Sequence, residues 1–265
     1  MEPPEFAVWL LREGSEGILT WEPTDDLASL ERGLAKAVHE AFGVGQLHRL
    51  SARVDPSDAV ARRALHRQGF RYEGLLRGAQ PLPGDTFGDL RLYARLVTDV
   101  TDGREGFTSV MNTVTPRKRL IAHALVTDVA GRVLLCETSF KPDWELPGGI
   151  VEPRESPADG LVREMTEEMG WAPAVQRPLV VDWLRPYLGW DDAVELVFAT
   201  QQVSDADRAR LAPDGLEILG LHWVEPEEFV ARMTPFGAAR ASSALRALAE
   251  GVTLYTEGGR TTPHR

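Results

Sequence analysis

The amino-acid sequence predicts a layered α/β protein built from two domains, and three observations support this prediction. Segments with alternating apolar residues lie between segments with apolar residues at helical spacing. A polar stretch at 99–116 contains glycines and no sustained periodicity, which is typical of a linker. The chain has 265 residues, 43% hydrophobic and 26% charged, so it can bury a core and is not intrinsically disordered.

The first domain, residues 1–98, is predicted to alternate strands with helices. A helix is expected over Leu27–Phe42, where apolar residues form one stripe. A second helix is expected over 56–67, with Asp55 as its N-cap and Pro56 at its first position. Strands are expected at 6–11, 17–21 and 48–54, followed by a hairpin of 70–78 with 90–96.

The second domain, residues 117–265, is predicted to place strands around helices without strict alternation. It begins with a predicted hairpin, in which strands 120–127 and 132–136 flank a turn at 128–131. The remaining elements are a helix at 156–169, strands at 179–184, 194–200 and 216–224, and helices at 226–233 and 236–249.

The helix at 156–169 has the best-defined boundaries of all these elements. Ser156 and Asp159 have the spacing of a capping box, and Pro157 occupies the first helical position, where its missing N–H is harmless. Gly170 can end the helix in the left-handed conformation. Local chemistry therefore fixes both ends of this helix.

Three carboxylates are predicted to share one patch of this helix. Glu164, Glu167 and Glu168 stand at i, i+3 and i+4, so they repel one another unless a cation relieves the repulsion. Mg²⁺ and Mn²⁺ prefer such oxygen ligands, and the Pro147-Gly148-Gly149 loop before the helix lets the backbone come close and offer a carbonyl to the metal. An acidic helix alone is normally a solvated face, but the fixed spacing to Gly149 and Glu155 favours a metal site.

The segment that carries these residues resembles a complete Nudix box. It reads Gly149, five residues, Glu155, seven residues, and then Arg163-Glu164-Met165-Thr166-Glu167-Glu168-Met169-Gly170-Trp171. The similarity extends over roughly 117–260. The resemblance implies an α/β/α sandwich with a mixed sheet, preceded by the smaller first domain.

The resemblance also implies roles for individual residues. Glu164, Glu167 and Glu168 would coordinate Mg²⁺, with Mn²⁺ as a substitute and the Gly149 carbonyl as an auxiliary ligand. Arg163 would pair with Glu155 and thereby orient the loop and the helix. The implied reaction is attack of water on a diphosphate within a nucleoside diphosphate linked to another group, with a glutamate as the base.

The base and the substrate both stay open at this point. Glu167 or Glu168 could accept the proton, as could a carboxylate from a later loop, where Glu217 is favoured and Glu195 is second. In related enzymes, a proline at the position of Pro186 is associated with ADP-ribose, and a tyrosine at the position of Tyr187 with dinucleoside polyphosphates. This chain has both residues, so the two substrates are not distinguished. A nucleoside triphosphate is a further candidate. The alternative function is a non-catalytic nucleotide-sensing or protein-interaction module with the same fold.

Residues 17–96 resemble the C-terminal part of a GNAT acetyltransferase. The stretches that carry this resemblance are 47–56, 61–65 and 69–74. The loop at 22–27, where the family binds pyrophosphate, contains three acidic residues, one proline and no glycine, so it would repel that group. We therefore expect an inactive domain kept for packing, partner binding or a homodimer, in which its first strands pair with another chain.

Composition limits the partners of the chain. The net charge is −11, which argues against nucleic-acid and membrane-surface binding, and no apolar run is long enough to span a bilayer. The single cysteine, Cys136, fits a reducing cytoplasm and is expected in the core. The six histidines show no metal-ligand spacing, and Trp144, Trp183 and Trp190 are each as well suited to core packing as to base stacking.

Overall fold

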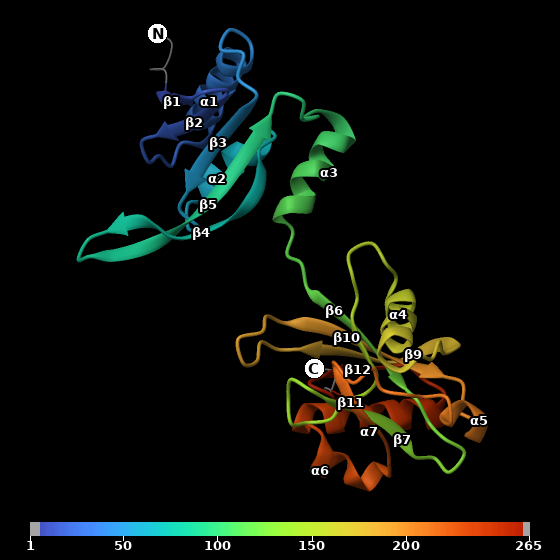
Figure 1. Ribbon diagram of the computed structural model, residues 1–265. Coiled ribbons are helices and arrows are strands. Elements are labelled where there is room, and N and C mark those ends of the chain that lie inside the picture. Colours follow the sequence, from blue (N-terminus) through green and yellow to red (C-terminus); the bar gives the residue numbers. More distant parts are fainter. Residues whose placement is uncertain (1–5, 262–265) are drawn as a thin grey trace. The chain divides into compact units, whose positions relative to one another are not determined.

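The computed structural model describes residues 6–261, and the chain divides into two compact units (Figure 1). Unit 1 is Met1–Pro116 and unit 2 is Arg117–Arg265. Both units combine helices with strands, so the predicted α/β class is confirmed. Among the helices of residues 6–261, none is both long enough and apolar enough to cross a membrane.

Unit 1 is a five-stranded sheet with two helices packed on one face. Its elements are β1 (Val8–Glu13), β2 (Glu16–Trp21), α1 (Leu27–Phe42), β3 (Arg49–Val54), α2 (Ala59–Arg67), β4 (Arg71–Leu82), β5 (Thr86–Leu96) and α3 (Gly103–Val114). The strand order is β1-β2-β3-β5-β4, and only β2 and β3 run parallel. The core joins Leu30 and Leu34 of α1 and Leu65 of α2 to Leu50 and Tyr93 of the sheet. The helix predicted over Leu27–Phe42 has those bounds.

The start of α2 differs from the prediction. Asp58, not Asp55, is the N-cap, and its carboxylate accepts from the Ala61 N–H at 2.8 Å. Asp55 instead accepts from the Ser57 N–H at 2.7 Å and closes a turn that holds Pro56 outside the helix. Asp55 and Asp58 can both act as an N-cap, but the carboxylate of Asp55 is used in the turn, so Asp58 caps the helix.

The predicted linker 99–116 contains the helix α3, which is a correction to the sequence analysis. Tertiary packing stabilises this helix although few of its residues are apolar: Gly106 and Val110 are buried, and Thr113 accepts a hydrogen bond from the Tyr72 N–H at 3.0 Å. A Cβ on Gly106 would lie 2.2 Å from the carbonyl carbon of Thr101, so the close approach requires glycine. One glycine and one valine on the buried face give too weak a periodicity to detect.

Unit 2 has a mixed five-stranded sheet and a separate two-stranded sheet. Its strands are β6 (Arg119–Leu125), β7 (Val133–Thr138), β8 (Gly148–Ile150), β9 (Val175–Leu184), β10 (Ala193–Thr200), β11 (Ile218–Val224) and β12 (Leu254–Glu257). Its helices are α4 (Pro157–Met169), α5 (Asp205–Arg208), the 3₁₀ turn η1 (Pro226–Glu228), α6 (Phe229–Arg232) and α7 (Pro235–Glu250). The strand orders are β12-β9-β10-β6-β8 and β11-β7.

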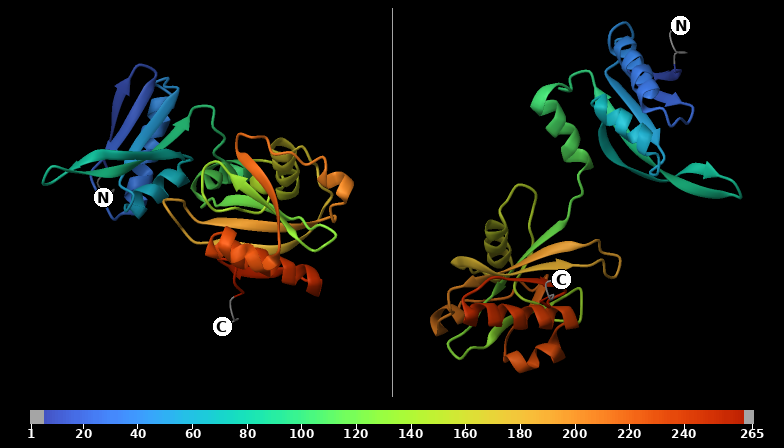
Figure 2. Two further views of the ribbon diagram at one scale, coloured as in Figure 1. Left: turned by 60° about the horizontal axis from the view of Figure 1, so that its bottom comes forward. Right: turned by 180° about the vertical axis from the view of Figure 1, so that it is seen from behind.

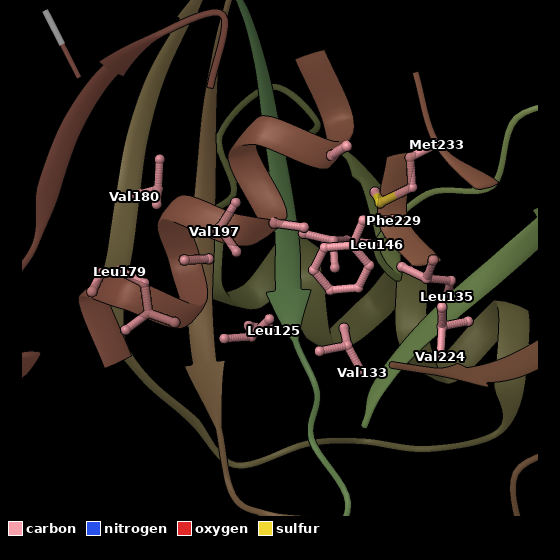
Figure 3. Packing of buried hydrophobic residues seen from close by; sticks show 14 of the residues in the cluster. Leu125, Val133, Leu135, Leu146, Leu179, Val180, Val197, Val224, Phe229 and Met233 are labelled. Carbon is pink, nitrogen blue, oxygen red and sulfur yellow. The ribbon is translucent and has the colours of Figure 1, made fainter. Parts of the chain in front are cut away.

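The helices α4 and α7 cover opposite faces of the larger sheet (Figure 2). Ala122 and Ala124 of β6 pack toward α4, whereas Leu125 belongs to the cluster that includes α7. Figure 3 shows this second cluster, where Phe229 and Met233 meet Leu135 and other strand residues. Cys136 is buried, as expected for core packing.

The predicted hairpin at the start of unit 2 does not form as a strand pair. The turn is present, because Asp128 accepts from the N–H groups of Ala130 and Arg132 at 2.9 and 3.0 Å. Beyond the Thr127–Val133 bridge, however, β7 pairs with β11 in the other sheet. Both edges of β6 are already occupied, by β10 and β8, so it has no free edge for β7.

Candidate active site

The helix α4 presents its polar face because its apolar face is fixed in the core. Leu161, Met165 and Met169, at successive turns, are fully buried. Ser156 caps the helix by accepting from the Asp159 N–H at 3.1 Å. Gly170 ends it with φ of 68°, as predicted. The residues from 163 to 168 that do not face the core are therefore held at a defined orientation.

Arg163 connects the loop 151–156 to the acidic face of α4. Its guanidinium donates to Glu155 at 2.7 Å, to the Ile150 carbonyl at 3.2 Å, to Glu164 at 2.9 Å and to Glu167 at 3.2 Å. The hydrogen bond from Arg163 lowers the pKa of the Glu155 carboxyl. The ion pair between Arg163 and Glu155 is therefore present, and its role in orienting the loop stays a prediction.

Gly149 brings the backbone of β8 against the helix. A Cβ at this position would lie 2.8 Å from the Glu164 carboxyl carbon, so no other residue fits without moving that carboxylate. The strand is held in place because Gly149 pairs with Ala122 on β6. This geometry places the backbone at residue 149 beside the first of the three predicted metal ligands.

Glu168 has the most strongly raised pKa of the three predicted metal ligands. Its Oε2 atom is buried and has no hydrogen-bond partner. Burial, followed by the charges of Glu164, Glu145, Glu217 and Asp214, raises the pKa of Glu168 to about 8. Burial also raises the pKa of Glu164, whose carboxylate binds Arg163, while the Glu167 side chain is largely exposed.

The acidic side chains do not form a ready-made metal centre in the part of the chain that the structure describes. Within 6–261, no three His, Cys, Asp or Glu side chains are arranged closely enough to hold an ion. Two of the predicted ligands are engaged elsewhere, because the Arg163 guanidinium donates to the carboxylates of Glu164 and Glu167. The orphaned, buried Oε2 of Glu168 nevertheless fits a divalent cation, since a carboxylate in that position lacks any other counter-charge.

The structure brings one of the two later candidate bases to this site. The charge of Glu217 contributes to the raised pKa values of Glu164 and Glu168, and its side chain is exposed. The backbone of its loop is fixed, because Asp214 accepts from the Glu217 and Ile218 N–H groups at 3.2 and 2.9 Å.

Glu195, the second candidate base, is not available to the site. It is 2% exposed, and its two oxygens bind Arg240 at 2.8 Å and His123 at 2.7 Å. Burial alone would raise its pKa, but Arg240 and His123 outweigh that effect and hold the pKa at about 2. Arg240 also binds the buried Asp182 at 2.8 Å, so Glu195 belongs to a structural network.

Sequence reasoning missed two acidic residues near Glu168. Glu145 and Asp214 both contribute to its raised pKa. The only signal for Glu145 is its place directly before the Leu146-Pro147-Gly148-Gly149 segment. Asp214 lies in a polar loop with no local pattern, and its position became visible only through the fold.

The tryptophans and the loop after the box have defined contacts. Trp144 stacks on His222 with ring centroids 3.9 Å apart, and Arg119 lies 4.4 Å from the centre of the Trp190 ring. Tyr187 and Trp190 close a tight turn through backbone hydrogen bonds of 3.1 and 3.0 Å. Tyr187 is half-exposed and meets the edge of Phe236 at 5.9 Å.

A family model matches most of unit 2, and the chain is similar to several known proteins. The family model described as NUDIX domain matches residues 117–246. A Bacillus subtilis (strain 168) protein named "Putative 8-oxo-dGTP diphosphatase" is 33% identical over 114 residues, which cover 43% of this chain and 71% of that protein. A MutT protein from Methanosarcina mazei Go1 has a TM-score of 0.42 and 24% identity, covering 52% of this chain and 99% of the other. A GNAT-family acetyltransferase from Bacillus anthracis is also similar, with a TM-score of 0.32 and 20% identity over 35% of this chain and 58% of the other.

Proposed function

The chain belongs to the Nudix family, and from that membership we propose that unit 2 is a Mg²⁺-dependent hydrolase of phosphoric anhydrides. It would cleave a diphosphate bond in a nucleoside diphosphate linked to another group. The observation that carries this proposal is the buried, unpartnered Glu168 oxygen, on which the charges of four other carboxylates act. Such a group is unfavourable in a purely structural role.

Glu164, Glu167 and Glu168 are the proposed metal ligands, together with the Gly149 carbonyl. When bound, Mg²⁺ would neutralise negative charge on the phosphoryl oxygens and lower the pKa of a bound water, and Mn²⁺ could replace it. A positive charge beside Glu168 favours its ionised form, which reverses the effect of burial on its pKa. Arg163 would hold the loop 151–156 against the helix through Glu155 and Ile150.

Glu217 is the favoured base among Glu167, Glu168 and Glu217. Its loop is fixed by backbone contacts, since the Ser139 N–H donates to its carbonyl at 2.9 Å and Asp214 holds its own N–H. Its carboxylate stays exposed and therefore keeps access to water and substrate. A general base must reach the water that it deprotonates, and an exposed side chain on a fixed loop meets that requirement.

The substrate is proposed to be a small nucleotide, and three classes fit the proposal. They are an oxidised or ordinary nucleoside triphosphate, ADP-ribose or a related nucleotide sugar, and a dinucleoside polyphosphate. The name of the Bacillus subtilis relative supports the first class. Tyr187, exposed next to Pro186, supports the other two, because both residues stand after the box in this chain.

We propose that unit 1 has no acetyltransferase activity. Its acidic loop contains Asp26, which caps α1 by accepting from the Ser29 N–H at 3.1 Å and from the Ser29 hydroxyl at 2.6 Å. A carboxylate thus occupies the helix N-terminus at which a pyrophosphate would have to bind. Binding of acetyl-CoA to the full chain, measured by calorimetry, would contradict this proposal.

The test of the hydrolase is product release from a panel of these substrates with Mg²⁺ and with Mn²⁺. Glu168→Gln keeps the size of the side chain and removes its charge, so we expect turnover to fall about 10²-fold or more. Glu250→Gln, an exposed position at the end of α7, is the matched control and should retain full turnover. Nucleotide binding without turnover of any substrate would contradict the hydrolase and favour the sensing module.

A further inference from the structure

The strand β1 is an open edge of the sheet in unit 1. It pairs with β2 alone, and in residues 6–261 no strand covers its other side. A two-residue turn joins the two strands, so the pair Glu13–Glu16 closes the hairpin. The alternation of an antiparallel ladder then directs the backbone groups of residues 8, 10 and 12 toward the open edge. Figure 1 shows β1 at this end of the sheet.

Three successive apolar side chains of this edge strand are exposed, which is unusual. Trp9 is 50%, Leu10 41% and Leu11 59% exposed. Natural edge strands are normally protected by charges, prolines or bulges, because an open apolar edge recruits another strand. Leu10 points to the helix-covered face, since a Cβ on Gly17 would lie 2.5 Å from its Cδ1 atom. Trp9 and Leu11 consequently point to the opposite face.

We propose that β1 pairs with β1 of a second copy of this chain, antiparallel and with Leu10 on the two-fold axis. In this register the residues with outward backbone groups face one another, Leu10 with Leu10 and Val8 with Arg12 of the second copy. Trp9 of each copy lies opposite Leu11 of the other copy. The dimer therefore contains two Trp9–Leu11 pairs, in which each side chain covers the apolar surface of its partner. A two-fold axis perpendicular to the sheet keeps the helices of both copies on one side.

Charge complementarity supports the same register. Arg12 is exposed and lies on the helix-covered face, where it would stand opposite Val8 of the second copy. Val8 lines a cavity of about 230 Å³ between β1 and α1, together with Gly33, Lys36 and Glu40 of α1. In the proposed dimer, Arg12 of each copy would lie near the α1 face of the other, where Glu40 offers an exposed carboxylate. The register avoids placing Arg12 against its own symmetry mate.

The first test is disulfide formation in the Leu10→Cys variant of the full chain. Directly paired residues of antiparallel strands have Cα atoms about 5.5 Å apart, which a disulfide can bridge. Mild oxidation should therefore give a reducible dimer, and the native Cys136 is buried and gives little background. Leu75→Cys is the matched control, because Leu75 is 45% exposed on β4, the other edge strand, and should stay uncrosslinked.

The second test measures dimer dissociation by light scattering and analytical ultracentrifugation. Arg12→Glu should weaken the dimer about tenfold, and Arg12→Glu combined with Glu40→Arg should restore it, because the two exposed pairs reverse together. Lys36 lies one turn before Glu40, and a tighter dimer in Arg12→Glu would show that Arg12 meets Lys36, which would overturn the pairing of Arg12 with Glu40. A monomeric wild-type chain at tens of micromolar, or crosslinking through Leu75→Cys as readily as through Leu10→Cys, would overturn the proposal.

Discussion

Arg240→Met tests whether the buried charge network in unit 2 is held by one cation. The Arg240 side chain is 10% exposed and binds Asp182 and Glu195, each at 2.8 Å. Asp182 is also bound by the Thr256 hydroxyl at 2.6 Å and by the Gly259 N–H at 2.9 Å, which ties β12 to β9. Methionine has a similar volume without the charge, so the variant leaves two buried carboxylates without their cation.

The expected loss of stability is about 3–5 kcal/mol, the usual range when one partner of a buried ion pair is removed. The pKa of Glu195 leads to a similar figure. Its depression from 4.5 to about 2 corresponds to about 3 kcal/mol of stability at neutral pH. For a unit of this size, such a loss lowers the melting temperature by about 10 °C.

The pH dependence gives the sharper result. In the wild-type chain, a depressed carboxyl pKa means that the stabilisation is present above pH 4.5 and is lost as the pH falls toward about 2. In Arg240→Met, the cation that lowers the Glu195 pKa most is gone, while burial and the contact with His123 remain, so the pKa of Glu195 should rise and acidification from pH 7 toward 4.5 should cost the variant less stability than the wild type. The difference between the two proteins should therefore shrink as the pH falls.

Urea unfolding followed by tryptophan fluorescence reports on unit 2, because five of the seven tryptophans lie after residue 116. Arg246→Met is the matched control, since Arg246 is exposed on the same helix and should change stability by less than about 0.5 kcal/mol. A loss below about 1 kcal/mol in Arg240→Met, or a difference from wild type that is constant between pH 7 and 4.5, would refute the network.

Two further predictions concern the candidate active site. In Gly149→Ala, the added Cβ lies 2.8 Å from the Glu164 carboxyl carbon and displaces it, so we expect kcat/KM to fall about 10²-fold with little change in melting temperature. Gly74→Ala has open space and is the control for that substitution; equal activity of both variants would contradict the close approach. Asp214→Ala releases the backbone of the Glu217 loop, so kcat should fall about tenfold while substrate binding, measured by calorimetry, is retained. Loss of binding together with kcat would instead place Asp214 in substrate recognition.

The parts of the fold that local chemistry determines could be predicted from the sequence. The bounds of α1 follow from its apolar stripe, and both ends of α4 follow from Ser156 and Gly170. Helical spacing alone predicts a shared patch of Glu164, Glu167 and Glu168, and their role as metal ligands stays a prediction. Each of these inferences needs only residues within about four turns of one another.

The parts that depend on distant residues could not be predicted. The pairing of β7 with β11 requires knowing that β6 is already flanked by other strands. Glu195 looked like a candidate base because Arg240, which neutralises it, is far away in the sequence and meets it only after α7 packs on the sheet. Asp214 and Glu145 approach Glu168 for the same reason, through packing that no local pattern encodes.

The buried clusters of the two units share no residue, and this separation bears on how the chain could have evolved. One cluster contains residues of unit 1 only, and the other two contain residues of unit 2 only. Substitutions accumulating in one unit therefore leave the core of its neighbour unchanged. Substitutions in the loop at 22–27 could therefore accumulate while every carboxylate on α4 is retained. Fusion, loss or exchange of either half would leave the buried cluster of the other half with all of its residues.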